Sequence, residues 1–144
     1  MNKMFKIIFE YNDANEEYAL ESAWAIKVED HYKLDNILFY APEYSLGDIV
    51  SAEERNKELY VTGLIKESGH STVRILFNNK KDVQITRNKL IQLGCDSEIS
   101  NIPKLISVDI PRSVDYFKSV RPFLEKGVEK DLWGYEEACI AHHN

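Results

Sequence analysis

The chain has few cysteines, prolines and glycines, and it has no long apolar run. Its 144 residues include two cysteines, four prolines and six glycines. No stretch approaches the roughly 20 apolar residues of a membrane-spanning helix, and the N-terminus lacks the apolar stretch and small-residue cleavage site of a signal peptide. Cys95 and Cys139 lie far apart with no CxxC pair, which argues against a disulfide framework. We therefore expect a cytoplasmic protein without membrane attachment, whose two thiols are free.

The composition is that of a soluble, folded protein. Hydrophobic residues make up 44% of the chain and charged residues 29%, which excludes a disordered or membrane-embedded protein. The length allows one ordinary domain or two small packed lobes.

Negative charge is concentrated in the first half. Residues 1–69 contain 7 Lys or Arg against 14 Asp or Glu, whereas residues 70–144 contain 11 against 10. Binding to nucleic acid depends largely on clustered Lys and Arg, so an acidic half argues against it. The asymmetry either serves solubility or steers the protein toward a basic partner.

The first half reads as a run of short strands separated by turns. Apolar and aromatic residues with approximate alternation predict strands at 4–11, 18–28, 32–40, 48–52 and 59–66. Good helix formers in 16–25 leave a helix open as the alternative there. Five short strands favour a small antiparallel β-barrel-like lobe over residues 1–69.

The second half has the order strand, helix, strand, strand, helix, strand. Strands are expected at 72–77, 95–99, 105–110 and 133–140. A helix over 82–93 should end at Gly94, and a second should begin after Ser113 and be interrupted by Pro122. The buried stripe expected for the first helix comprises Val83, Ile85, Leu90, Ile91 and Leu93. This order predicts a ferredoxin-like βαββαβ sandwich over residues 70–144, and hence an α+β protein whose two lobes pack as a unit.

Alternation along two of these strands predicts a polar face. Thr72 and Arg74 share one face of their strand, and Ser107 and Asp109 share one face of theirs, while Ile106, Val108 and Ile110 turn to the helices. If the first lobe covers the polar face, Arg74 and Asp109 should form a buried ion pair. If the face is open, His70, Thr72, Arg74 and Asp109 become a candidate polar site.

No motif in the chain predicts catalysis, a cofactor or a metal. His70 lies next to Ser71, but neighbouring strand residues point to opposite faces, so they form no catalytic dyad. Cys139, His142 and His143 are ligand types for zinc, yet a fourth ligand is not evident.

Several blocks of the sequence together resemble a known family. They are ESAWA (21–25), YKLDNILFYA (32–41), SLGDIV (45–50), SGHSTVRI (68–75), LGCDSE (93–98), ISVDIP (106–111) and WGYEEAC (133–139). In this order they are similar to the uncharacterised bacterial domain of unknown function 4265. The chain departs from the family pattern at Leu38 and Arg112, where proline is expected. The resemblance implies no established activity.

Two functions remain as hypotheses. The first is a protein-binding module of immunity or inhibitor type that neutralises a basic toxin or enzyme surface through acidic residues and aromatic anchors. Its candidate contacts are Asp35, Tyr40, Glu43, Tyr44, Glu53 and Glu54. The alternative is a small enzyme or ligand sensor whose pocket lies between the lobes. In this pocket Arg74 would hold an anion and His70 would transfer a proton.

Overall fold

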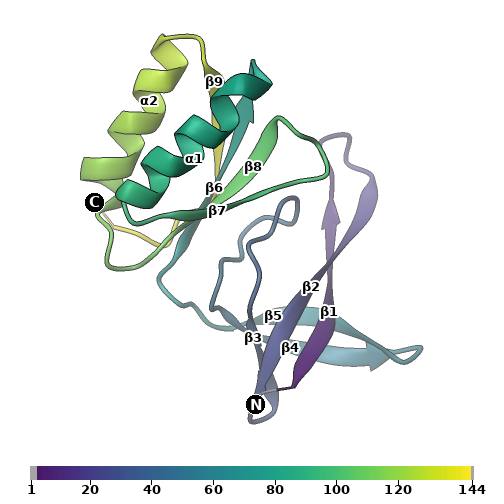
Figure 1. Cartoon of the computed structure of the whole chain (residues 1–144). Helices are drawn as coiled ribbons and strands as arrows, with labels where there is room; N and C mark the ends of the chain where they lie inside the picture. Colours follow the sequence, from purple (N-terminus) through teal and green to yellow (C-terminus); the bar gives the residue numbers. More distant parts are fainter. Residues whose placement is uncertain (1–2, 144) are drawn as a thin grey trace.

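The computed structural model describes residues 3–143, which fold into two lobes, one above the other in Figure 1. The first lobe contains five strands: β1 (Met4–Asn12), β2 (Tyr18–Val28), β3 (His31–Leu34), β4 (Ile49–Arg55) and β5 (Glu58–Lys66). The second contains β6 (Ser71–Phe77), a 3-10 turn (Lys80–Asp82), α1 (Val83–Gln92), β7 (Asp96–Ile99), β8 (Leu105–Ile110), a π-helical turn (Tyr116–Val120), α2 (Arg121–Glu129) and β9 (Trp133–Cys139).

The first lobe is a sheet that closes on itself. Neighbouring strands are antiparallel, and a short parallel pairing of Ile7–Ile8 with Leu59–Tyr60 joins β1 to β5. Alternate residues point inward, and they form a core that includes Ile7, Phe9, Ala25 and Val50. The helix considered for residues 16–25 does not form, because this segment is part of β2.

The strand expected over 32–40 is shorter than predicted. It ends at Leu34, and residues 35–48, which we call the interlobe loop, leave the first sheet and cross to the second lobe. The side chain of Asn36 accepts a hydrogen bond from the backbone of Trp24, and Asp35 donates to the carbonyl of Trp24. Asp35 and Asn36 therefore end the strand by hydrogen bonding beside it.

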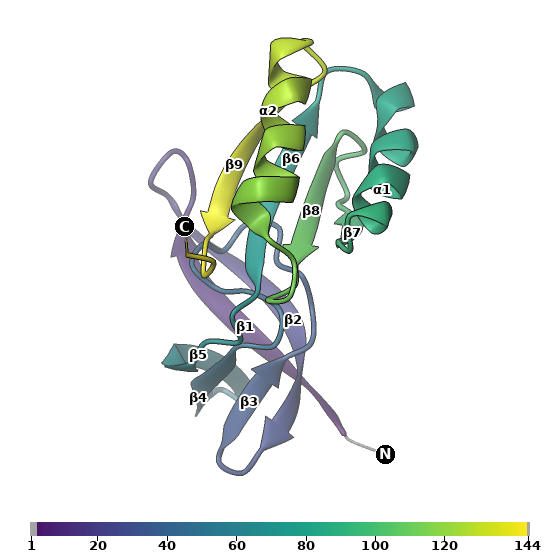
Figure 2. The same ribbon diagram turned by 90° about the vertical axis from the view of Figure 1, so that its left-hand side faces the viewer.

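The second lobe is a four-stranded antiparallel sheet in the order β7-β8-β6-β9. Figure 2 shows α1 and α2 lying on the same face of this sheet. The predicted alternation holds, because Val73, Ile75, Ile106, Val108 and Ile110 all belong to the core beneath the helices.

The first helix buries a narrower stripe than the sequence predicts. Val83, Thr86 and Leu90 are buried, at the i, i+3, i+7 spacing of one helical face. Ile85 and Ile91 were expected in the stripe but are more than half exposed. The helix ends as expected before Gly94, which adopts a left-handed φ of 92°.

The second helical segment begins two residues later than predicted. Asp115, not Ser113, caps it by accepting a hydrogen bond from the backbone of Lys118 at 3.1 Å. A π-helical turn precedes α2, and Pro122 lies in the first turn of α2, where a missing N–H costs little. Proline therefore divides the segment into two pieces, as its backbone chemistry predicts.

The architecture is mostly β with two helices and mainly antiparallel sheets, which places it in the predicted α+β class. Among residues 3–143, no helix is long and apolar enough to cross a membrane.

Candidate functional site

The face of the second sheet opposite the helices is the predicted polar face, and the interlobe loop covers it. Thr72, Arg74, Ser107 and Asp109, which we call the loop face, are all buried. Strand pairing sets Thr72 opposite Asp109 and Arg74 opposite Ser107. The four side chains therefore lie together between the lobes, and Arg74 among them also lines a groove at the surface.

Most of the loop face binds the backbone or side chains of the interlobe loop. Arg74 donates through its Nη atoms to the carbonyls of Tyr40 (3.2 Å) and Ala41 (2.7 Å). Ser107 donates to the carbonyl of Leu38 at 2.6 Å. A buried loop has backbone carbonyls that no strand or helix partner bonds. The side chains of Arg74 and Ser107 therefore donate the hydrogen bonds that these carbonyls would otherwise lack.

The opposite side of the same loop segment is held by the first lobe. The carboxylate of Glu21, on β2, accepts hydrogen bonds from the backbone N–H groups of Phe39 (2.8 Å), Tyr40 (3.0 Å) and Ala41 (2.8 Å). One carboxylate thus binds the donors of the segment and one guanidinium binds its acceptors. Sequence reasoning missed Glu21, because nothing in the pattern of β2 shows that a loop lies beside it.

The expected ion pair between Arg74 and Asp109 does not form. Arg74 pairs with Glu136 on β9 at 3.0 Å, and Asp109 accepts from Nδ1 of His70 at 2.8 Å. Burial raises the pKa of Asp109, and the hydrogen bond from His70 opposes that rise. The reason is register: Arg74 and Asp109 lie diagonally on paired strands, so each meets a nearer partner.

The four residues of the predicted polar site share no pocket. Thr72 is buried against Ser45, with its hydroxyl 2.7 Å from that of Ser45. His70 lines one hollow of the surface and Arg74 lines another. His70 and Arg74 therefore do not line one common hollow.

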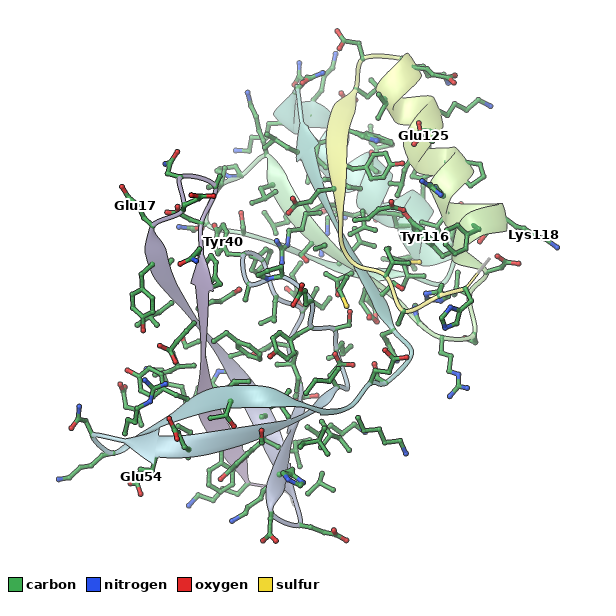
Figure 3. The ribbon with its side chains drawn as sticks, turned by 180° about the vertical axis from the view of Figure 1, so that it is seen from behind. Glu17, Tyr40, Glu54, Tyr116, Lys118 and Glu125 are labelled. Carbon is green, nitrogen blue, oxygen red and sulfur yellow. The ribbon has the colours of Figure 1, made fainter. Side chains whose placement is uncertain are left out.

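The six predicted partner-binding residues also lie apart. Tyr44 packs its ring on Phe9 in the first-lobe core, with ring centroids 4.9 Å apart. The hydroxyl of Tyr40 donates to Asn101 of the second lobe at 2.9 Å, whereas Figure 3 shows Glu54 near the tip of the β4–β5 hairpin. The other exposed members are Asp35 and Glu43 on the interlobe loop and Glu53 on β4.

Tyr40 does line a groove that both lobes build. The groove has a volume of about 480 Å³ and lies between the β1–β2 turn, the interlobe loop and β9. Besides one cation, Arg74, its lining includes three aromatic and three acidic residues: Tyr11, Phe39, Tyr40, Asp13, Glu136 and Glu137. We call these six residues the aromatic–acidic groove.

The surroundings of this groove are negatively charged. Burial, followed by the nearby charge of Glu21, raises the pKa of Tyr11. Glu136 stays largely exposed although it pairs with Arg74. Glu137 accepts from the Tyr116 hydroxyl at 2.5 Å, and burial together with this bond raises the pKa of Tyr116. Three acidic residues against one arginine leave the lining with a net negative charge, which favours a cation as ligand although Arg74 already pairs with Glu136.

The C-terminal residues considered as zinc ligands make structural contacts. Nε2 of His142 donates to the carbonyl of Pro111 (2.9 Å), and Nδ1 lies 2.6 Å from the Ser71 hydroxyl. Among residues 3–143, no cluster of His, Cys, Asp and Glu suited to a metal ion is found. Ser71 is fully buried and also accepts a hydrogen bond from the backbone N–H of Ala141. Ser71 and His142 thus bind residues 141–142 to the second lobe.

The fold and this geometry define a two-lobed α+β protein with a groove where its lobes meet. The family model described as "Domain of unknown function (DUF4265)" matches residues 21–135. The chain belongs to this family, as the sequence blocks predicted.

A solved structure resembles the whole chain. It is described as "Novel crystal structure of a hypothetical protein from Neisseria gonorrhoeae", with 25% sequence identity, a TM-score of 0.85 and 99% of each chain covered. A comparison with curated proteins gave no significant match.

Proposed function

We propose that this protein is a small protein-binding module of immunity or inhibitor type, which neutralises a basic toxin or enzyme by capturing a Lys or Arg side chain. The observation that carries the proposal is the aromatic–acidic groove. Its rings offer faces to a cation, and Asp13 and Glu136 offer charge-assisted hydrogen bonds, whereas the carboxylate of Glu137 is bonded to Tyr116 on the helix side.

The position of the groove supports a protein partner. Aromatic residues at the centre of an interface commonly contribute most of its binding energy, and Tyr40 is exposed while its hydroxyl is held by Asn101 at 2.9 Å. β9 is an edge strand beside the groove, and the interlobe loop already bonds to it where the N–H of Glu43 donates to the carbonyl of Ala138 at 3.2 Å. Strand edges of this kind can pair with an extended peptide. The negative charge of the first half adds long-range attraction toward a basic partner.

The alternative, a small enzyme or ligand sensor built on His70, Thr72, Arg74 and Asp109, has less support. Thr72 and Asp109 are buried and bonded to Ser45 and His70. The Nη atoms of Arg74 already donate hydrogen bonds to the interlobe loop and to Glu136. An anion would have to displace these bonds to reach the guanidinium.

A binding and rescue assay with the products of neighbouring genes tests the proposal. The purified protein should bind one of these products, and its co-expression should relieve that product's toxicity. Glu136→Lys should weaken binding by about tenfold or more, because it places a like charge against the bound cation.

Glu54→Lys is the matched control, since it makes the same charge change at the far tip of the first lobe (Figure 3). It should leave binding within about twofold of the unaltered protein at moderate salt. Equal losses of affinity in both variants would show that overall charge attraction, and not the groove, causes the binding. If no neighbouring product binds or is neutralised, the proposal is wrong.

We also propose finer descriptions of the two lobes. The closed hydrogen bonding of β1 to β5 supports a small barrel-like lobe over residues 1–69. The order β7-β8-β6-β9, with both helices on one face, supports a ferredoxin-like lobe over residues 70–144.

A further inference from the structure

A second hollow lies on the surface where the lobes meet, and its lining is basic. It has a volume of about 450 Å³ and is lined by residues from β3, β4, β5 and the segments that follow β5 and β8. Three of its lining residues are cations, Lys33, Lys66 and Arg112, and His70 also lines it. Glu67 is the one carboxylate among the described lining residues. We call these three cations with His70 the cationic hollow.

This concentration of positive charge stands out in an acidic lobe. Lys33 and Lys66 belong to the half of the chain that carries 7 basic against 14 acidic residues. Among residues 3–143, Lys33, Lys66 and Arg112 make no ion pair within 4.0 Å. The hollow thus has three cations against the single carboxylate of Glu67, and this excess of positive charge stabilises an anion placed in it.

Arg112 is held in place by a glycine. Gly69 adopts a left-handed φ of 91°, and a Cβ built on it would lie 2.8 Å from Cδ and 3.0 Å from Cγ of Arg112. The aliphatic stem of Arg112 therefore packs directly on the backbone of Gly69. This packing restricts the stem of Arg112 before any ligand binds, which lowers part of the entropic cost of binding, while its side chain stays exposed to a ligand.

His70 is oriented by a buried carboxylate. Its Nδ1 donates to Asp109, which is 3% exposed, while the imidazole itself is about a quarter exposed. With Nδ1 engaged, Nε2 is the ring nitrogen left for a ligand. A carboxylate that fixes a histidine ring in this way is common where the other nitrogen binds or exchanges a proton.

We propose that the cationic hollow binds the phosphate group of a small phosphorylated molecule. Arg112 supplies a forked donor suited to phosphate oxygens, Lys33 and Lys66 supply point charges, and His70 in its doubly protonated form supplies an Nε2–H donor. The site is separate from the aromatic–acidic groove, which has no residue in common with it, so the two can be tested independently.

Titration with inorganic phosphate, followed by calorimetry and by the NMR signals of the histidine rings, tests this site. We expect saturable binding in the millimolar range, which is ordinary for an isolated small anion. Among the four histidines of the chain, the ring signals of His70 should move with the same midpoint, and those of His143 should not. A sugar phosphate that binds more tightly than inorganic phosphate would identify an organic ligand, whereas equal affinities would identify free phosphate.

Arg112→Gln and Lys66→Gln should each weaken phosphate binding by about tenfold, as expected for the loss of one charge-assisted contact. Lys118→Gln, on the π-helical turn of the second lobe (Figure 3), is the matched control and should change the affinity less than about twofold. The proposal is overturned if binding does not saturate, if the His70 signals stay still, or if Lys118→Gln weakens binding as much as Arg112→Gln.

Discussion

The helix face and the loop face of the second sheet each have a buried part, yet these two parts are built from opposite kinds of residue. The helix face presents Val73, Ile75, Ile106 and Val108 to α1 and α2. The loop face presents Thr72, Arg74, Ser107 and Asp109 to the interlobe loop and to His70. The same strands carry both sets by simple alternation.

The difference reflects what covers each face. A helix satisfies its own backbone hydrogen bonds, so the sheet beneath it needs to offer only apolar packing. The interlobe loop has no such internal pairing, and its carbonyls at Leu38, Tyr40 and Ala41 are bonded by Ser107 and Arg74. Buried polar residues on the loop face of this protein are therefore explained by the loop that covers them, and they need not form a catalytic site.

The largest expected effect lies on the helix face, at Gly127. A Cβ on this residue of α2 would lie 2.0 Å from the Trp133 ring, whose indole N–H donates to the carbonyl of Leu124. Gly127→Ala should cost about 3 kcal/mol of unfolding free energy, because the ring has to move within a packed core. Urea denaturation followed by tryptophan fluorescence measures this loss.

Gly134→Ala serves as the control for Gly127→Ala. It lies in β9, and a Cβ there meets nothing within 4 Å, so stability should change by less than about 1 kcal/mol. A similar loss in both variants would show that backbone propensity and not the Trp133 contact sets the cost.

An intermediate effect is expected on the loop face, at Arg74. Arg74→Met keeps much of the side-chain volume but leaves the carbonyls of Tyr40 and Ala41 without their donor. We expect a loss of about 2 kcal/mol. Arg121→Met, which removes an exposed guanidinium 3.6 Å from Glu137, should cost less than about 1 kcal/mol.

Hydrogen exchange separates this local effect from a global one. In Arg74→Met the amides of Phe39, Tyr40 and Ala41, which bind Glu21, should exchange faster, while amides of β6 and β8 follow global stability. If the loop amides keep their protection in the variant, Arg74 does not hold the loop.

The smallest expected effect concerns the two cysteines of the unaltered protein. Cys95 belongs to the helix-side core and is 1% exposed, and burial raises its pKa to about 12. Cys139 is half-buried beside Ser45 of the interlobe loop, and burial also raises its pKa. A raised pKa means less reactive thiolate at a given pH than in the unfolded chain, so native labelling should be slow and should accelerate as pH rises.

With a thiol reagent at pH 8, Cys139 should react about tenfold faster than Cys95, since opening a loop costs less than opening a core. Cys139→Ser assigns the two phases, and both thiols should react alike in denaturant. Equal native rates would mean that the loop face opens only when the whole protein unfolds.

Much of this fold could be predicted because it depends on local pattern. Alternation separated Ile106 and Val108 from Ser107 and Asp109, and Gly94 marked the end of α1. The errors arose where distant contacts outweighed local preference. Ile85 is exposed because Thr86 occupies the buried stripe, and residues 35–40 leave their strand to cover another sheet.

The candidate sites could be predicted only in part. Tyr40 and His70 were identified, but the groove and the hollow they line could not be, because Tyr11, Glu136, Lys66 and Arg112 come from separate elements. Only a folded chain brings such residues together.

The amino-acid sequence by itself determined the α+β order of elements, the two faces of the second sheet and the acidic first half, since each follows from neighbouring residues or from composition. Tertiary structure alone decided that Arg74 binds loop carbonyls, that Asp109 pairs with His70, and that the acidic groove and the basic hollow lie where the lobes meet. The physical reason is that a buried polar group takes whichever partner the packed chain brings within hydrogen-bonding distance.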